Sequence, residues 1–249
     1  MQQPSIVVPN PMSGTLQQSQ QPQQPWNQAY LDPAFARRGR ALAIASGLFA
    51  VLSLCLCVAA CSLPWVNVPM SKTGAGFMPI PECSLSIGLV HYGYYGTSCP
   101  ATYQPKWGEN TMLQQCTIGF SVAFAVCSGG YGLIALAILL ASLAAAGLTF
   151  FSSTLSCERY NRSSAAPVTR LFCGTAFSLV VLSATTFALA CVGLLVAVGW
   201  IGPYPLYAVD GTGRLSCYAC IACSFVSMAL ATALKFRTRA YGKTVAAGV

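Results

Sequence analysis

The chain has 249 residues, of which 55% are hydrophobic and only 7% are charged. Because soluble globular domains contain roughly 25% charged residues to cover their surface, this composition excludes an ordinary soluble fold. The net charge of +8 does not indicate a nucleic-acid partner, since the basic residues are spread over several segments and form no single patch.

The first part of the chain, residues 1–36, is polar and rich in Gln and Pro. Such a composition cannot bury enough apolar surface to fold, so we expect a disordered tail. Pro22 and Pro25 form a P-x-x-P spacing that a proline-binding domain could bind as an extended left-handed helix. A plain solvated tail is the alternative.

Four stretches contain no Asp, Glu, Lys, Arg or His, and they are residues 41–63, 117–151, 171–201 and 215–234. Each reaches the roughly 20 residues that a helix needs to cross a bilayer. In lipid, only a helix or a closed barrel satisfies all of its own backbone hydrogen-bonding groups. The sequence therefore predicts an all-α membrane protein with four antiparallel transmembrane helices in a lipid bilayer.

The basic residues are divided unequally between the two sides that this topology creates. Ten lie on the side of the termini: Arg37, Arg38, Arg40, Arg159, Arg162, Arg170, Lys235, Arg237, Arg239 and Lys243. The other side has three, Lys72, Lys106 and Arg214. Because positive loops stay in the cytosol, we expect both termini, including a basic tail at 235–249, to be cytoplasmic, and we expect a plasma-membrane location. The sequon at Asn161 then carries no glycan.

The outward loop at 64–116 is too long to be a simple turn and must fold on itself or pack on a partner. Its segments Trp65–Val68 and Ser84–Leu89 favour short strands, so the loop is expected to contain β structure. Aromatic residues follow in the same loop, and the candidates for protein contacts are Trp65, Tyr92, Tyr94, Tyr95 and Trp107. The alternative is that these aromatic residues form the loop's own core or anchor it at the lipid headgroups.

Three cysteines, Cys83, Cys99 and Cys116, lie in or beside this loop, in an oxidising compartment where a disulfide is expected. We favour a bridge between Cys83 and Cys99, while a bridge between Cys99 and Cys116 stays open. Cys157 lies at the predicted cytoplasmic membrane edge, an environment typical of reversible palmitoylation. Its alternative is an unmodified thiol.

Small residues recur at four-residue spacing in the first two spans. One set is Gly39, Ala43 and Gly47, and the other is Ala137, Ala141 and Ala145. Such small-xxx-small patterns allow two helix backbones to approach closely. We expect this contact within the chain, with a contact between copies as the alternative.

Cys217, Cys220 and Cys223 form a C-x-x-C-x-x-C motif at the start of the fourth span. A zinc site needs a fourth ligand and usually loops that wrap around the metal, so no metal and no cofactor are expected. As an alternative, four spans with a C-x-x-C motif beside an outward loop containing cysteines resemble the vitamin K epoxide reductases. That resemblance implies a membrane thiol oxidoreductase in which Cys217 and Cys220 exchange electrons with a loop pair.

The segment Leu63–Val68, LPWVNV, follows the first span directly, and Gly88 and Leu89 come later in the same loop. This order, followed by three further spans, resembles the claudins and peripheral myelin proteins and, more distantly, the amastins. Trp65 then corresponds to a Trp on the first outward strand, and Gly88 and Leu89 begin a Gly-Leu-Trp triplet in which Val90 replaces the Trp. The resemblance implies membrane organisation, adhesion or barrier formation through the outward loop.

We therefore expect a non-enzymatic membrane protein that contacts partners, or other copies of itself, through its outward loop and spans. A component of a paracellular-type pore is a further alternative. A coupled transporter is not expected, because the spans contain no ionisable acidic, basic or His side chain. The sequence also contains no nucleotide-binding glycine motif, catalytic triad or carboxylate pair.

Overall fold

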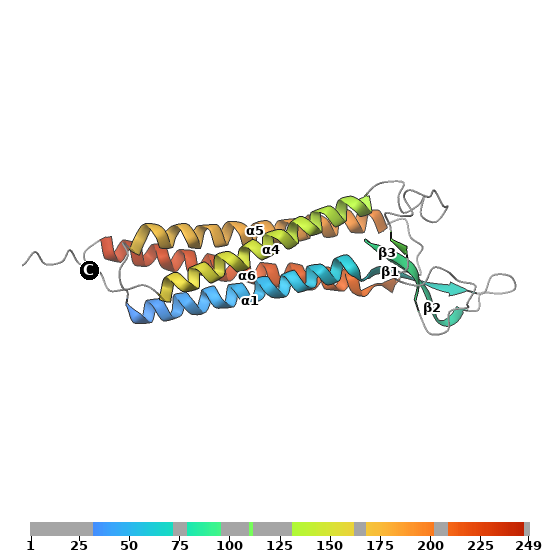
Figure 1. The fold of residues 1–249 in the computed structure, drawn as a ribbon, viewed down its shortest axis with the longest axis horizontal. Helices are drawn as coiled ribbons and strands as arrows, with labels where there is room; N and C mark the ends of the chain where they lie inside the picture. Colours follow the sequence, from blue (N-terminus) through green and yellow to red (C-terminus); the bar gives the residue numbers. More distant parts are fainter. Residues whose placement is uncertain are drawn as a thin grey trace, which may run out of the picture.

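The computed structural model describes residues 32–71, 79–95, 110–111, 131–161, 168–201 and 209–246. These residues form four long helices that lie side by side, with a small β-sheet at one end (Figure 1). The helices are α1 (Pro33–Ser62), α4 (Tyr131–Asn161), α5 (Val168–Ile201) and α6 (Thr212–Ala246). All four are long and apolar enough to cross a membrane, as the expected four-span architecture requires.

The helices extend beyond the uncharged stretches from which the spans were predicted. α1 begins at Pro33, where the Asp32 side chain accepts a hydrogen bond from the Ala34 backbone N–H at 3.0 Å and so caps the helix. α4 continues to Asn161 rather than ending at 151, and α6 continues to Ala246, so most of the expected tail at 235–249 is helical. The start expected at residue 117 lies outside the described residues.

Each of the four helices has a row of buried residues whose spacings alternate between three and four. They are Gly39, Ala43, Ser46, Ala50, Ser53, Cys57 and Ala60 on α1; Ala135, Leu139, Ser142, Ala146, Thr149, Ser153, Ser156 and Tyr160 on α4; Ala176, Leu179, Ser183, Thr186, Ala190, Gly193 and Ala197 on α5; and Gly213, Cys217, Cys220, Ser224, Ser227, Ala231, Leu234 and Thr238 on α6. An average spacing of 3.5 residues is the heptad repeat of helices that pack nearly parallel. Most of these residues are small, so the four backbones pack closely.

Each helix packs mainly on two neighbours, in the ring α1, α4, α5, α6. Hydroxyl groups join the helices across this ring. Ser153 donates to the carbonyl of Ala43 at 2.7 Å, Ser142 donates to that of Thr186 at 3.1 Å, and the hydroxyls of Ser152 and Ser178 lie 3.2 Å apart. In lipid, such bonds and the close packing of small residues hold helices together, because the hydrophobic effect does not.

The first set of small residues lies on the face of α1 that packs against α4. A Cβ atom added to Gly39 would lie 2.6 Å from Cε1 of Tyr160, and one added to Gly47 would lie 2.3 Å from Oγ of Ser153. This confirms that the set serves packing within the chain. The second set does not act as a unit, since Ala137 and Ala141 are exposed and only Ala145 is buried.

The sheet is antiparallel, with the strand order β4-β3-β2-β1-β5. Its strands are β1 (Pro64–Ser71), β2 (Pro79–Gly88), β3 (His91–Tyr95), β4 (Asn110–Thr111) and β5 (Val209–Asp210). β1 covers the first segment in which a strand was expected, and β2 covers the second except for Leu89, which follows the strand. β5, which comes from the link between α5 and α6, had not been expected, and it ties that link to the first loop.

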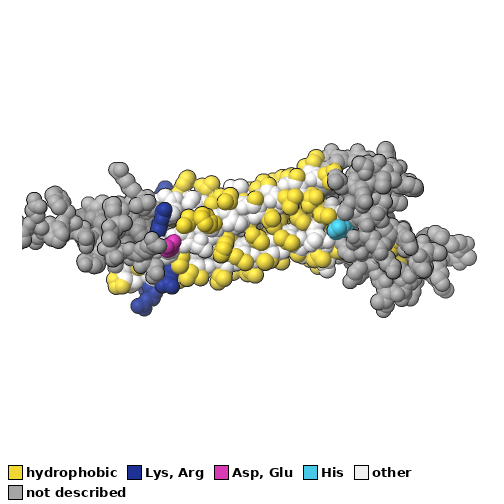
Figure 2. Space-filling model, viewed as in Figure 1, with side chains coloured by type: hydrophobic (Ala, Val, Ile, Leu, Met, Phe, Trp, Pro, Cys, Tyr) yellow, Lys and Arg dark blue, Asp and Glu magenta, His cyan; other side chains and the backbone are white. Residues whose placement is uncertain are grey.

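The two ends of the bundle differ in charge. We call the end at which α1 begins and α6 ends the basic end, and the opposite end the sheet end. At the basic end the rings of Phe35 and Tyr241 stack 4.1 Å apart, and Arg237 lies 5.5 Å from the Phe35 ring. Figure 2 shows dark blue side chains gathered near this end, while hydrophobic side chains cover the length of the bundle. This is the surface expected of a bundle surrounded by hydrocarbon.

Candidate functional site

The best-defined feature of the sheet end is the buried side chain of Trp65, the second residue of β1. It is 0% exposed, and its Nε1–H donates to the carbonyl of Ala60 in the last turns of α1 at 2.6 Å. The indole belongs to a hydrophobic cluster that includes Cys61, Ile87 and Leu139. Trp65 therefore connects the sheet with the bundle. Because it is buried, it is not the exposed contact residue that was considered from the sequence.

Two glycines let α6 approach the same point. A Cβ atom on Gly211 would lie 2.1 Å from the carbonyl oxygen of Pro64, and one on Gly213 would lie 2.9 Å from Cδ1 of Trp65. The backbone N–H of Gly211 donates to the carbonyl of Trp65 at 2.8 Å. No larger residue fits at either position without moving β1 away from α6.

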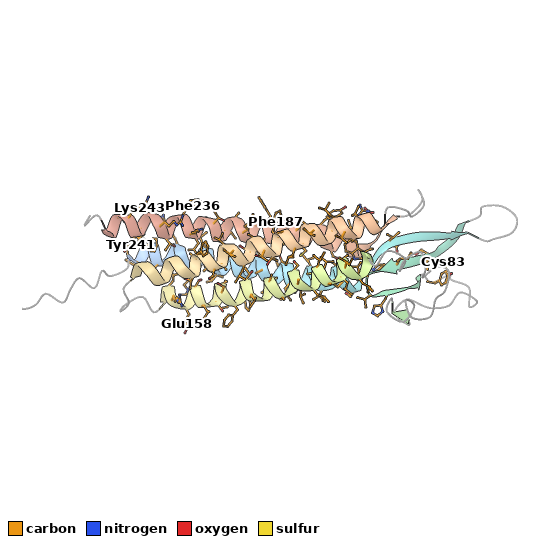
Figure 3. The ribbon with its side chains drawn as sticks, turned by 90° about the horizontal axis from the view of Figure 1, so that it is seen from above. Cys83, Glu158, Phe187, Phe236, Tyr241 and Lys243 are labelled. Carbon is orange, nitrogen blue, oxygen red and sulfur yellow. The ribbon has the colours of Figure 1, made fainter. Side chains whose placement is uncertain are left out.

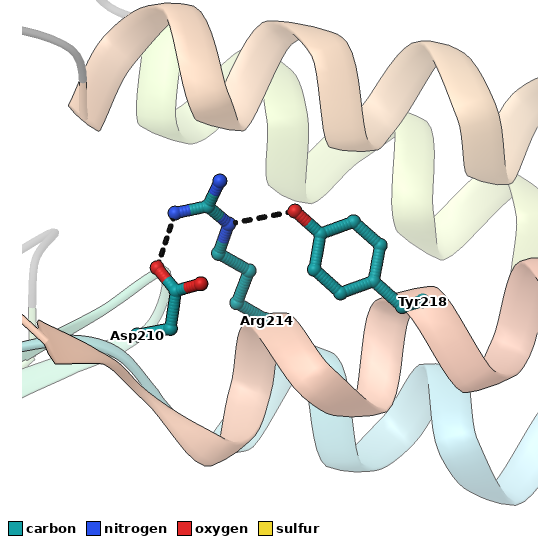
Figure 4. Close-up of polar contacts among 3 residues, drawn as sticks. All are labelled: Asp210, Arg214 and Tyr218. Carbon is teal, nitrogen blue, oxygen red and sulfur yellow. Dashed lines mark hydrogen bonds and ion pairs between the residues drawn. The ribbon is translucent and has the colours of Figure 1, made fainter.

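An ion pair holds β5 to the first turn of α6 (Figure 4). Arg214 forms a salt bridge with Asp210, and its Nε–H donates to the Tyr218 hydroxyl at 3.0 Å. Arg214 had been expected on the weakly basic side of the membrane, and it does lie at the sheet end, beside β5. At this position Arg214 links β5 to the first turn of α6 through Asp210.

The sheet rests on the bundle through alternate residues of β2 and the turn that follows. Ile87 and Leu89 are almost fully buried and belong to the same cluster as Trp65. On β1, Asn67 accepts a hydrogen bond from the Ser86 hydroxyl at 2.7 Å, between paired strands. The sheet is thus fixed to the membrane-spanning part through side chains from β1, β2 and α6.

The remaining loop candidates fall on β3 or outside the described residues. Tyr94 is half-buried and pairs in register with Leu85, while Tyr92 and Tyr95 lie on the same strand. Trp107 lies in a part of the chain that is not described.

Of the disulfide candidates, Cys83 is buried on β2 near the far end of the sheet (Figure 3) and is not among the free thiols. Cys99 and Cys116 lie outside the described ranges, so the pairing stays a prediction.

Four cysteines on α1 and α6 lie in the same hydrophobic cluster as Trp65, and they are Cys57, Cys61, Cys217 and Cys220. The Cys57 thiol donates to the carbonyl of Leu139 at 3.1 Å and lies near the thiols of Cys61 and Cys220, and Cys217 lies near Cys57 and Cys61. All four are free thiols in the hydrophobic cluster at this end. The sequence indicated Cys217 and Cys220, but Cys61 was missed. Its signal is the i, i+4 spacing from Cys57, which places both on one helix face.

Among the described residues, no group of three or more His, Cys, Asp or Glu side chains has a geometry that could hold a metal ion. Cys223, the third member of the C-x-x-C-x-x-C motif, is half-buried and lies outside the cluster.

The palmitoylation candidate Cys157 lies at the other end of the bundle. It is a free, half-buried thiol on α4, near the basic end. With Arg40 and Glu158 it lines a groove between α1 and α4. Figure 3 shows Glu158, Tyr241 and Lys243 at this end, far from Cys83.

No protein-family model matches this sequence, and no curated protein matches it either.

Proposed function

We propose that the protein is a non-enzymatic, multi-pass membrane protein that organises or joins membranes through its sheet. In this proposal the basic end faces the cytosol, because basic segments are retained there, and the sheet faces outward at the plasma membrane. The contacts are made by a partner protein or by a second copy of the chain. The resemblance to claudins and peripheral myelin proteins points to the same role.

The observation that carries the proposal is the junction at Trp65. A loop that only connected two spans would need no buried tryptophan, no glycine contacts and no ion pair to hold its strands on the helices. These contacts hold a sheet in a fixed orientation on the membrane-spanning part, and a preorganised surface loses little entropy when it binds. A disulfide from Cys83 would add to this rigidity.

The test is an association assay with the full chain in proteoliposomes. Two vesicle populations with different fluorescent lipids are mixed, and docking between vesicles and chemical cross-linking within one vesicle are both measured. Replacing Tyr92, Tyr94 and Tyr95 on β3 by Ser should reduce association, because tyrosines contribute strongly to protein contacts. A wild-type chain that neither docks nor cross-links would contradict association between copies of the chain, and contact with a partner protein would then be the form of the proposal that remains.

The control for this assay is Phe236→Ser. Phe236 is an aromatic residue, 65% exposed, at the basic end of α6. Because it lies far from the sheet, its replacement should leave association unchanged. An equal loss in both variants would show that the vesicles stick through exposed aromatic residues in general.

The converging thiols support a second candidate, a membrane thiol oxidoreductase. In this candidate the thiols of Cys217 and Cys220 would form an S–S bond and pass two electrons and two protons to a lipid-soluble quinone. Replacing Cys217 and Cys220 by Ser would abolish quinone reduction in this case, and no mixed disulfide with a partner would be trapped. Quinone reduction that survives the double replacement would exclude this candidate.

A paracellular-type pore is a third possibility. An interior void lined by Ser53, Thr149, Thr186 and Ser224 has no room for a water molecule. A paracellular pore would form between several copies, along their sheets, and an ion current across a cell layer would reveal it.

A further inference from the structure

A groove lies between α1 and α4 near the basic end, on the outer surface of the bundle. Its volume is about 300 Å³. Ile44, Leu48 and Phe150 line its sides, and all three side chains are more than 40% exposed in the absence of lipid. The groove is therefore open to whatever surrounds the helices, and in a membrane this is the hydrocarbon of one leaflet.

The groove is a consequence of the close contact between the two helices. At its base Gly47 has no side chain, and Ser153 donates to the carbonyl of Ala43 across the contact at 2.7 Å. The two backbones are held together there, and the larger side chains on both sides of the contact form the walls. No larger residue fits at Gly47 in the base of the groove, because its Cβ atom would collide with the Ser153 hydroxyl.

The lining changes from charged to apolar along the groove. Arg40 and Glu158 lie at one end, and Leu48 and Phe150 lie at the other, eight residues further along each antiparallel helix. Eight helical residues correspond to about 12 Å. A phospholipid has the same polarity over a similar length, with a charged headgroup at the membrane surface and a chain that extends inward.

The charge at the mouth favours an anionic headgroup. Where α1 begins and α4 ends, the described residues include four arginines and two carboxylates, which are Arg37, Arg38, Arg40, Arg159, Asp32 and Glu158. Arg37, Arg40 and Ile44 follow one another at helical spacing and so share a face of α1. A basic pocket between membrane helices is the type of site that binds anionic lipid headgroups.

We infer that this groove is a binding site for one anionic phospholipid of the leaflet at the basic end. One acyl chain lies against Ile44, Leu48 and Phe150, and the phosphate pairs with Arg40. The lipid covers the contact between α1 and α4.

The test uses the full-length protein in phosphatidylcholine nanodiscs. A phosphatidylserine probe with a photoreactive group on its acyl chain is added, and cross-linking to α1 and α4 peptides is measured against probe concentration. We expect saturable labelling that unlabelled phosphatidylserine displaces. We expect Arg40→Gln to weaken apparent binding about fivefold, the effect of one basic residue near an anionic surface.

Two matched controls separate the groove from general effects. Arg239→Gln removes the same charge from an exposed position on α6 and should leave labelling unchanged. Thr154→Trp places a large side chain in the groove, while Thr185→Trp places one at an exposed position on α5; both threonines donate only to carbonyls of their own helix. Only Thr154→Trp should abolish labelling, with the fold of both variants checked by thermal unfolding.

Three outcomes would overturn the inference. Equal losses in Arg40→Gln and Arg239→Gln would indicate general attraction of anionic lipid to the basic end. Equal labelling by a phosphatidylcholine probe would show that the groove does not select its lipid by charge. An acyl adduct on Cys157 that survives denaturation, and that hydroxylamine removes, would identify a covalently attached chain as the occupant.

Discussion

The hydroxyl groups of Ser46 on α1 and Ser227 on α6 donate to each other's backbone carbonyls, at 3.2 and 3.0 Å. One heptad closer to the sheet end, Ser53 and Cys220 repeat the arrangement, with side-chain to carbonyl distances of 3.5 and 3.3 Å. Such reciprocal bonds require two backbones in close contact, which only small side chains permit. The interface between the first and last helices is therefore determined by its small residues.

Replacing Ser227 by Leu should destabilise the bundle by about 1 to 3 kcal/mol, because the added carbons have no space between α1 and α6. The measurement is thermal unfolding in mild detergent. The matched control is Ala229→Leu, at an exposed position on the same helix, which should have little effect. Equal effects of the two changes would show that α1 and α6 are not packed as described.

Replacing Ser227 by Ala should be mild by comparison. It removes the hydroxyl bond and keeps the space, and interhelical hydrogen bonds in membranes average about 0.6 kcal/mol. A loss as large as that of the Leu variant would mean that hydrogen bonding, rather than side-chain size, determines this interface.

Trp65→Ala should cost about 3 to 5 kcal/mol, as expected for deletion of a fully buried aromatic side chain. Trp65→Phe should cost less, since it retains most of the ring volume and loses mainly the bond to the Ala60 carbonyl. Limited proteolysis of the first loop gives a second measurement, because a detached sheet exposes its connections. A loop in the Ala variant that resists protease as the wild type does would contradict the anchoring role.

Gly213→Ala should destabilise the sheet end, because the new methyl group would lie 2.9 Å from Trp65 Cδ1 and 2.6 Å from the Leu63 carbonyl oxygen. Gly199→Ala is the control. Gly199 is an exposed helical glycine with no atom within 4 Å of an added Cβ, so Ala should stabilise α5 by up to about 1 kcal/mol. We expect Gly213→Ala to lower the melting temperature and Gly199→Ala to raise it. A higher melting temperature in both variants would contradict the close approach of α6 to β1.

Asp210→Asn should change stability by less than about 1 kcal/mol, since the Arg214–Asp210 pair is partly exposed and ion pairs of this kind contribute little. The difference from the wild type should shrink as salt is added. Unfolding curves at low and high salt test this prediction. A large loss of stability that does not depend on salt would show that the Arg214–Asp210 pair contributes more than a surface ion pair.

The four spans could be predicted from the sequence because each excludes charge for longer than a bilayer is thick. Their ends could not, since a charged residue at the membrane edge keeps its helical hydrogen bonds, as Arg37 and Lys235 do. The heptad of small residues was visible in part at Gly39, Ala43 and Gly47. Its hydroxyl members were overlooked because Ser and Thr are weak signals within an apolar run.

The sheet end was harder to predict, because its core joins segments that are far apart in the sequence. Trp65 was considered as an exposed contact, but contacts from α6 and β2 bury it completely. Cys61 lies beside Cys57, but its proximity to Cys217 depends on the packing of α1 against α6. Neither arrangement follows from local spacing alone.

We propose that the four helices cross the membrane with the basic end in the cytosol and the sheet outside. The most direct measurement is antibody binding in intact and permeabilised cells to full-length protein with one epitope inserted between Gly74 and Ala75 and a second after Val249. We expect the loop epitope to bind antibody in intact cells and the C-terminal epitope to bind it only after permeabilisation. Antibody binding to the C-terminal epitope in intact cells would contradict a cytosolic basic end.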